Sequence, residues 1–246
     1  RGKAFGIMGA AFGVGFVVGL VIGGLLGDLG PRVPFFVAAG LSLANFIYGS
    51  IALPETHPKE KRRPMKLSEV HPFGAVVNIP GGVNVRTLAI ALFVLFLGQA
   101  VYPACWAFWS NAVFGWDSRM IGLSLAAYGI SNTITQAVLV GRWTKKWGER
   151  KASLVALFLN VLNFVFTGLA TQSWMAFAVI VLASPAGVAI PAMNAWMSKL
   201  APPDAQGRLQ GTIGAAEGLS SIFGPIVMTQ IFGAFETKVP GAPFFA

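Results

Sequence analysis

Two stretches of this chain repeat one pattern of small residues: GKAFGIMGAAFGVGFVVG at residues 2–19 and GRLQGTIGAAEGLSSIFG at residues 207–224. Gly6 and Gly211, which correspond in the two copies, stand 205 positions apart. Each copy leads towards a Pro-Phe-Phe sequence, which begins at Pro34 and at Pro243. A repeat with so long a period predicts an internal duplication into two structural halves rather than a solenoid of short units.

The composition predicts an all-α membrane protein. Of the 246 residues, 55% are hydrophobic and only 11% are charged, and the mean hydropathy is +0.68. A soluble domain of this size cannot cover so much apolar surface with polar groups. The apolar segments are about twenty residues long, the length that crosses a hydrocarbon core of about 30 Å. The single cysteine, Cys105, excludes a disulfide framework within the chain.

We expect seven membrane spans and the start of an eighth at Pro243. The seven lie at about 4–27, 34–53, 86–110, 119–141, 150–170, 173–198 and 210–233. The one long polar connection, residues 54–85, carries both histidines, His57 and His71. Two loop histidines without a further ligand predict no metal site, and no metal or other cofactor is expected.

The basic residues predict the orientation of the spans. If the N-terminus of the chain is cytoplasmic, 15 of the 18 lysines and arginines fall on the inner side, and only Arg32, Arg119 and Lys238 fall outside. The positive-inside rule favours this arrangement. The net charge of +9 is then a property of cytoplasmic loops near lipid, so it requires no nucleic-acid partner.

The number of spans between the two copies indicates the architecture. Six spans separate them, and an even number returns the second copy in the same orientation. A parallel 6+6 repeat with a long link resembles the 12-helix plan of major facilitator superfamily transporters. The resemblance implies a fragment that covers helices 5 to 11 and the start of helix 12. Residues 1–53 would end the N-terminal half, 54–85 would be the cytoplasmic linker, and 86–246 would belong to the C-terminal half.

Two short motifs also resemble patterns of this superfamily. Gly15, Gly19, Gly23 and Gly24 are similar to the glycine motif of drug/proton antiporters, although Leu20 replaces its proline. A helix-packing face is a sufficient alternative explanation for this spacing. Residues 141–151, GRWTKKWGERK, resemble the cytoplasmic loop motif of the superfamily, with Lys145 in place of the acid. Its matching residues are Gly141, Arg142, Gly148, Arg150 and Lys151, which are expected to form a charge latch or simply a basic loop.

A closer resemblance, to the tetracycline/proton antiporter family, rests on sequences spread along the chain. They are Phe114-Gly115-Trp116-Asp117, residues 121–127, Gln136-Ala137, Trp147-Gly148-Glu149 and Ile190-Pro191-Ala192-Met193. The resemblance implies a multi-pass protein of the bacterial inner membrane that exchanges a small amphipathic, drug-like molecule for protons and works as a monomer when complete. Two titratable positions of the family carry amides here, Asn132 and Asn160, and an amide cannot exchange a proton near neutral pH. The alternative interpretation is that these amides form interhelical hydrogen bonds.

One carboxylate, Glu217, lies inside a predicted span, and its counterpart in the first copy is Phe12. A carboxylate in hydrocarbon must be paired, hydrated or protonated. We therefore expect Glu217 either to carry the coupling proton or to pair with a cytoplasmic cation such as Arg208. Polar and aromatic residues inside spans predict the substrate-binding cavity: Gln99, Tyr102, Trp106, Asn132, Gln136, Asn160 and Asn194.

Three functions remain open from the sequence. The favoured one is a proton-coupled, tetracycline-like efflux antiporter that works by alternating access. The alternatives are a carrier of another amphipathic solute, which Asn132 and Asn160 favour, and a non-transporting truncated remnant. An enzyme is not expected, because no nucleophile–base pair, metal cluster or phosphate loop is present.

Overall fold

The computed structural model describes residues 32–53 and 82–246, together with positions 14, 15, 18, 19, 22, 23, 26, 29 and 30. The described residues are helical and contain no strand, as expected for long apolar segments whose backbone groups must be satisfied internally in lipid. Of the predicted link, residues 54–85, the part 54–81 lies outside the described residues, as does Gly24, and residues 82–85 are helical. Gly15, Gly19 and Gly23 are helical, and a Cβ at any of them would meet nothing within 4 Å.

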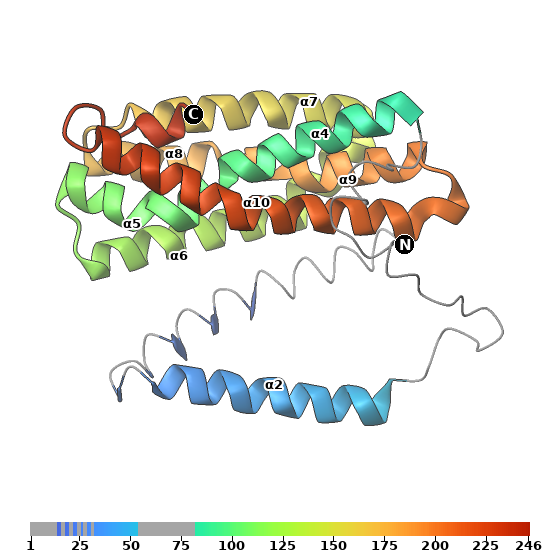
Figure 1. Cartoon of the computed structure of the whole chain (residues 1–246), viewed down its shortest axis with the longest axis horizontal. Coiled ribbons are helices and arrows are strands. Elements are labelled where there is room, and N and C mark those ends of the chain that lie inside the picture. The colour runs from blue at the N-terminus through green and yellow to red at the C-terminus, as the bar shows by residue number, and fades with distance from the viewer. Residues whose placement is uncertain are drawn as a thin grey trace.

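The first fully described helix is α2, Val33–Ala52, which begins with Pro34 in its first turn, where a missing N–H costs nothing. None of its residues is buried, and it lies apart from the other helices (Figure 1). The predicted span 34–53 therefore coincides with a helix.

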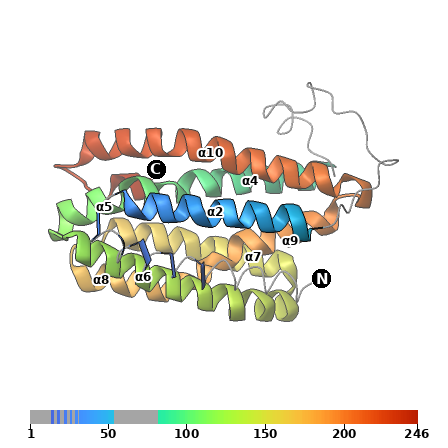
Figure 2. The same ribbon diagram turned by 90° about the horizontal axis from the view of Figure 1, so that it is seen from below.

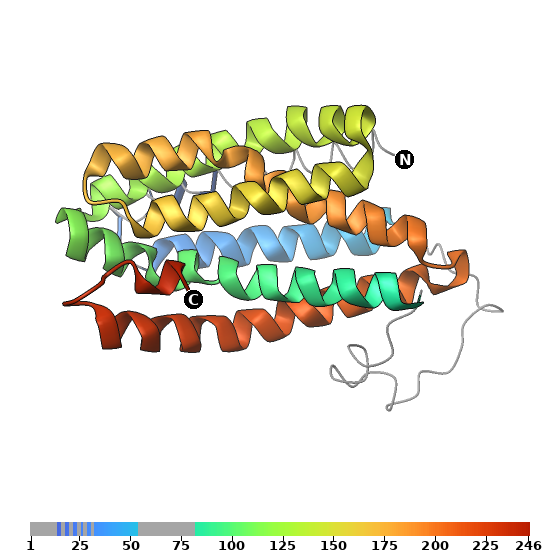
Figure 3. The ribbon, with the colours of Figure 1, turned by 90° about the horizontal axis from the view of Figure 1, so that it is seen from above.

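The remaining helices form one bundle. It comprises α4 (Gly82–Gln99), α5 (Val101–Phe114), α6 (Ser118–Ile134), α7 (Val140–Gly168), α8 (Ser173–Leu182), α9 (Ala189–Leu200) and α10 (Gln206–Phe235). Figures 2 and 3 show α10 and α4 along one side of the bundle and α6 and α8 along the other. The part of the chain that is described contains five continuous helical stretches long and apolar enough to cross a membrane.

Several spans differ from their predicted limits. The helix that was expected at 86–110 begins at Gly82 and runs as α4 and α5 to Phe114, with an interruption at Ala100. Pro103 explains this interruption, because it has no N–H for the Gln99 carbonyl four residues earlier. The helix expected to end at 141 continues beyond it, and the chain reverses at Gly148, whose φ of +75° and ψ of 163° are non-helical.

Two other short segments depart from α geometry. Residues Thr135–Leu139 form a π-helix, η3, between α6 and α7. Residues Ser184–Val188 form a 3-10 helix, η4, between α8 and α9, and contain Pro185. The two segments contact each other. Such irregular windings inside membrane spans concentrate at functional sites.

The bundle has two hydrophobic clusters. The first joins α4, α7, α9 and α10 through buried residues such as Val85, Leu92 and Met193. The second lies around α5 and includes Val101, Trp109 and Phe232. A short 3-10 helix, η6 (Ala242–Phe244), closes this second cluster with Phe244, at the position where the sequence predicted the start of another helix.

Candidate functional site

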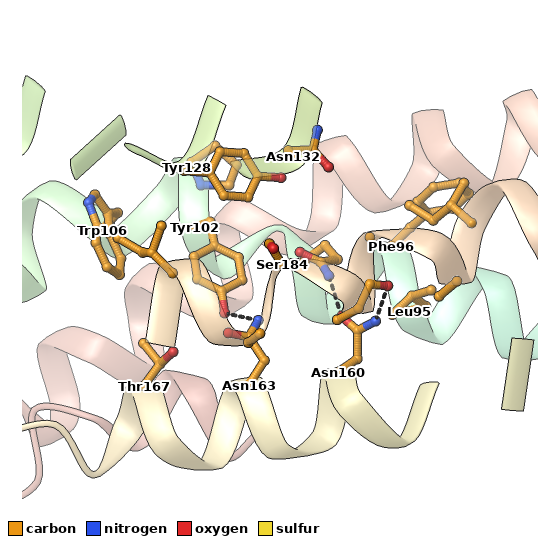
Figure 4. A pocket seen from close by; sticks show the side chains of 18 of the residues that line it. Leu95, Phe96, Tyr102, Trp106, Tyr128, Asn132, Asn160, Asn163, Thr167 and Ser184 are labelled. Atoms are coloured by element: carbon orange, nitrogen blue, oxygen red, sulfur yellow. Dashed lines mark hydrogen bonds between the residues drawn. The ribbon is translucent and has the colours of Figure 1, made fainter. Parts of the chain in front are cut away.

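A cavity of about 480 Å³ lies between the two clusters, since its wall takes Leu95 from the first and Trp106 from the second. Figure 4 shows its side chains converging from several helices. Of the seven residues predicted to bind substrate, six line it: Gln99, Tyr102, Trp106, Asn132, Gln136 and Asn160. Glu217 lines the same cavity. The lining therefore brings the predicted binding residues and the predicted proton carrier together.

The seventh residue, Asn194, is not among the cavity-lining residues. It lies on α9, where its side-chain Oδ1 is buried and has no hydrogen-bond partner among the described residues. The sequence did not predict this position of Asn194, because the polarity of a residue inside a span does not show which way its side chain faces. Asn194 is therefore a half-buried residue of α9 that does not line this cavity.

One end of the cavity is aromatic. The rings of Tyr102 and Trp106 lie 6.0 Å apart at an interplanar angle of 46°, and Tyr128 from α6 faces them (Figure 4). Trp106 is fixed because its Nε1–H donates to Ser124 Oγ at 2.9 Å. The Tyr102 hydroxyl accepts from Asn163 Nδ2 at 2.7 Å. With their polar groups hydrogen-bonded, these rings present an aromatic wall to the cavity, although Tyr102 is also stacked on Phe164.

Amides line the cavity farther from Trp106 (Figure 4). Asn160 on α7 is 3% exposed, and its Oδ1 accepts from Gln99 Nε2 at 2.7 Å. Its Nδ2 donates to the carbonyl of Ala186 at 2.9 Å and to that of Ala156 at 3.1 Å. Asn160 thus links α4, α7 and η4, which is the interhelical role that the sequence left as an alternative.

The break between α8 and α9 is held by side chains of the facing helix. Ser184 Oγ donates to the Val181 carbonyl at 2.9 Å, the group for which Pro185 has no N–H. Thr135 Oγ1 donates weakly to Ser184 Oγ at 3.4 Å, and Gln136 Nε2 donates to the Gly187 carbonyl at 3.3 Å. Ser184 and Gly187 were not predicted as site residues, although two prolines flanking Gly187 within one apolar span are the signal that marks the break.

Glu217 on α10 is exposed to the cavity. It has no hydrogen bond or ion pair with any residue in the described part of the chain. Among the described residues that line the cavity, none is a lysine, arginine or histidine, and Glu217 is the one acidic residue.

The wall formed by α10 is held close to α4 and α5 by Gly224. A Cβ at this position would overlap the Cβ of Ala100 and lie 3.6 Å from the Leu97 carbonyl oxygen. A glycine is therefore required for the two backbones to approach, and this is the packing role that small residues have in membrane helices.

The predicted cytoplasmic motif forms the turn at Gly148. Gly141, Arg142, Arg150 and Lys151 are exposed there. The ion pair at the turn uses Glu149, whose Oε1 accepts from Lys199 Nζ of α9 at 2.6 Å. This hydrogen bond lowers the pKa of the Glu149 carboxyl below its ordinary value. The turn therefore joins α7 to α9 through an acid and a lysine that the predicted set did not include.

Long apolar helices around a cavity with aromatic, amide and carboxylate walls define a transmembrane carrier. The model of the Major Facilitator Superfamily matches residues 1–109 and, again, residues 88–244. The chain belongs to this superfamily of membrane transporters, which confirms the resemblance and the all-α fold predicted from the sequence. The double match also agrees with the internal duplication.

The chain is similar to tetracycline resistance proteins. It is 38% identical over 234 residues to the class C protein of Escherichia coli and 34% identical over 236 residues to the class G protein of Vibrio anguillarum. Each alignment covers 95% of this chain and 59% of the relative, so the chain spans about three fifths of their length.

The fold is similar to the crystal structure of the human organic anion transporter MFSD10 (TETRAN). The TM-score is 0.79 at 22% identity, over 99% of this chain and 60% of that one. The match supports a multi-pass carrier fold.

Proposed function

We propose that the complete protein carrying this sequence is a proton-coupled exporter of an amphipathic, tetracycline-like molecule, working by alternating access. The observation that carries the proposal is the cavity of about 480 Å³, whose wall combines aromatic rings with side-chain amides. Flat molecules with polar edges suit such a wall, since rings bury their faces and amides bond their edges. The similarity to proteins named for tetracycline resistance supports the same class of cargo.

Glu217 is the proposed proton carrier. It lines the cavity, and its side chain makes neither an ion pair nor a hydrogen bond with the described residues. Asn132 and Asn160, which also line the cavity, cannot titrate near neutral pH. A carboxylate that is protonated in one state of the carrier and ionised in the other would exchange one proton for cargo.

The proposed setting is the inner membrane of a bacterium, with the N-terminus of this chain on the cytoplasmic side. Residues 1–53 and 86–246 would belong to the two six-helix halves, joined by the linker 54–85, and one complete copy would transport as a monomer. The excess of basic residues on one side supports this orientation. The charge latch would then lie at the cytoplasmic turn around Gly148.

A carrier of another amphipathic solute is the second candidate, because amides replace the titratable groups of the tetracycline/proton antiporter family at Asn132 and Asn160. An organic anion, the cargo named for MFSD10, fits less well, because no basic residue lines this cavity.

Accumulation of tetracycline in cells tests the proposal. Cells that express the complete protein should accumulate less tetracycline than empty-vector cells, and an uncoupler that collapses the proton gradient should abolish the difference. A difference that survives the uncoupler would reject proton coupling. Equal accumulation with and without expression would reject tetracycline export and would leave another solute or a non-transporting protein.

A further inference from the structure

Two backbone carbonyl groups stand at the break between α8 and α9. An α-helix bonds each carbonyl to the N–H four residues later, and Pro191 has no N–H for the Gly187 carbonyl. The Ala186 carbonyl accepts from the backbone N–H of Ala189, three residues later, as 3-10 winding requires. A side-chain amide of a neighbouring helix also donates to each carbonyl: Asn160 to Ala186 and Gln136 to Gly187.

These two amide bonds differ in length and setting. The Asn160–Ala186 bond is 2.9 Å long, and Asn160 is 3% exposed and held again by Gln99. The Gln136–Gly187 bond is 3.3 Å long, beyond the usual 2.7–3.2 Å range, and joins two half-buried residues that line the cavity. Both bonds lie at the cavity wall, but the first is shorter and almost fully buried, whereas the second is longer and joins two residues that are only half-buried.

The surroundings of Gly187 leave no room for a side chain. A Cβ at this position would lie 2.9 Å from Asn132 Oδ1 and 3.9 Å from Gln136 Nε2. The space that a side chain would take is therefore filled by two amides of the facing helix. Gln136 thus donates to a carbonyl that its own helix cannot bond in the α manner, and Asn132 lies against the Cα of the same residue.

We propose that the Gly187 carbonyl oxygen is a cargo subsite, at which a hydroxyl or N–H group of the cargo displaces the Gln136 amide and donates in its place. The subsite rests on the proposed function, since it names one contact of the exported molecule. Asn160 meanwhile keeps Ala186 fixed to α7. Because the Gln136–Gly187 bond joins the α6–η3 helix to the α8–α9 helix, its exchange removes one tie between them when cargo binds.

Equilibrium binding of tetracycline to the purified complete protein tests the subsite. Tetracycline carries several hydroxyl groups and an amide, and Gln136→Met keeps the length of the side chain but removes its donor. We expect tetracycline to bind Gln136→Met about threefold to tenfold more tightly than wild type, because no protein bond need be displaced. Tetraphenylphosphonium is an amphipathic cation without O–H or N–H groups, so its affinity for Gln136→Met should equal its affinity for wild type.

Two further variants serve as references. Asn160→Met should weaken tetracycline binding, because it leaves both the Ala186 carbonyl and the Gln99 amide without this partner. Gly122→Ala should leave binding unchanged, since a Cβ on this α6 residue meets nothing within 4 Å.

The outcomes separate the two proposals. Binding to Gln136→Met that is equal to or weaker than wild type overturns the subsite and makes Gln136 a structural brace. A gain shared by tetraphenylphosphonium also overturns it, because enlargement of the cavity would then be the cause. A folded wild-type protein that does not bind tetracycline overturns the proposed cargo, and the subsite with it.

Discussion

Asn160 on α7 and Glu217 on α10 line the same cavity, but they differ in burial and in hydrogen bonding. Asn160 is 3% exposed, and both ends of its amide are bonded, to Gln99 and to two backbone carbonyls. Glu217 is exposed and has neither a hydrogen bond nor an ion pair with the residues that the structure describes. The saturated amide holds three helices together, whereas the open carboxylate remains available for a proton or a cargo group.

The difference follows from the chemistry of the two groups. An amide has both donors and acceptors, so neighbouring amides and broken helix backbone can satisfy it completely. An ionised carboxylate only accepts, and a wall without basic residues offers it no counter-charge. Substitution of Glu217 should therefore affect proton-coupled transport, whereas substitution of Asn160 should affect stability.

The largest effect is expected from Glu217→Gln. Glutamine keeps the shape of the side chain but cannot titrate, so uptake of tetracycline into inverted vesicles under an imposed pH gradient should be lost. Exchange of labelled for unlabelled tetracycline without a gradient should persist, because it requires no net proton movement. Glu217→Asp, which keeps the carboxylate, is the matched control. Gradient-driven uptake by Glu217→Gln would show that the proton is carried elsewhere.

On the α7 wall, Asn160→Leu should destabilise the protein by about 2–4 kcal/mol, because two buried polar groups, on Gln99 and Ala186, lose a partner. The thermal midpoint in detergent should fall accordingly. Asn194→Leu is the contrasting variant, since its Oδ1 already lacks a partner among the described residues and its removal should cost little or even stabilise. Equal losses in both variants would contradict the bracing role of Asn160.

On the α10 wall, Gly224→Ala should cost about 1–3 kcal/mol, because the added methyl group overlaps Ala100 at the closest approach of α10 to the α4–α5 junction. Gly218→Ala on the same helix is the control, since a Cβ there meets nothing within 4 Å. A helix-propensity gain, expected at both positions, should therefore appear only at Gly218. If both substitutions stabilise, the helices are not in tight contact at Gly224.

Much of the architecture could be predicted from the sequence because span length and hydropathy follow directly from bilayer thickness. The cavity residues were largely predictable for a related reason: a polar side chain inside a span has few places to lie other than a protein interior. Asn194 shows the limit of this prediction. A polar residue inside a span can either pack against other helices or line a cavity, and the sequence does not distinguish the two. The subsite at Gly187 could not be predicted from side chains, because the group that forms it is a backbone carbonyl. Only Pro185 and Pro191, which interrupt the helix on either side, indicate its position.

The smallest effect is expected at the turn around Gly148, where Lys199 and Glu149 are paired with side chains 66% and 21% exposed. Such a pair contributes at most about 1 kcal/mol and is weakened by salt. Because the pKa of Glu149 is lowered in the folded protein, this contribution is present above the ordinary pKa of a glutamate and declines as the pH falls through the lowered value. A double-mutant cycle of Glu149→Gln and Lys199→Met, measured by thermal unfolding at neutral pH and again well below the ordinary glutamate pKa, should show coupling only at neutral pH. Coupling that persists in acid would mean that the two side chains interact through packing rather than charge.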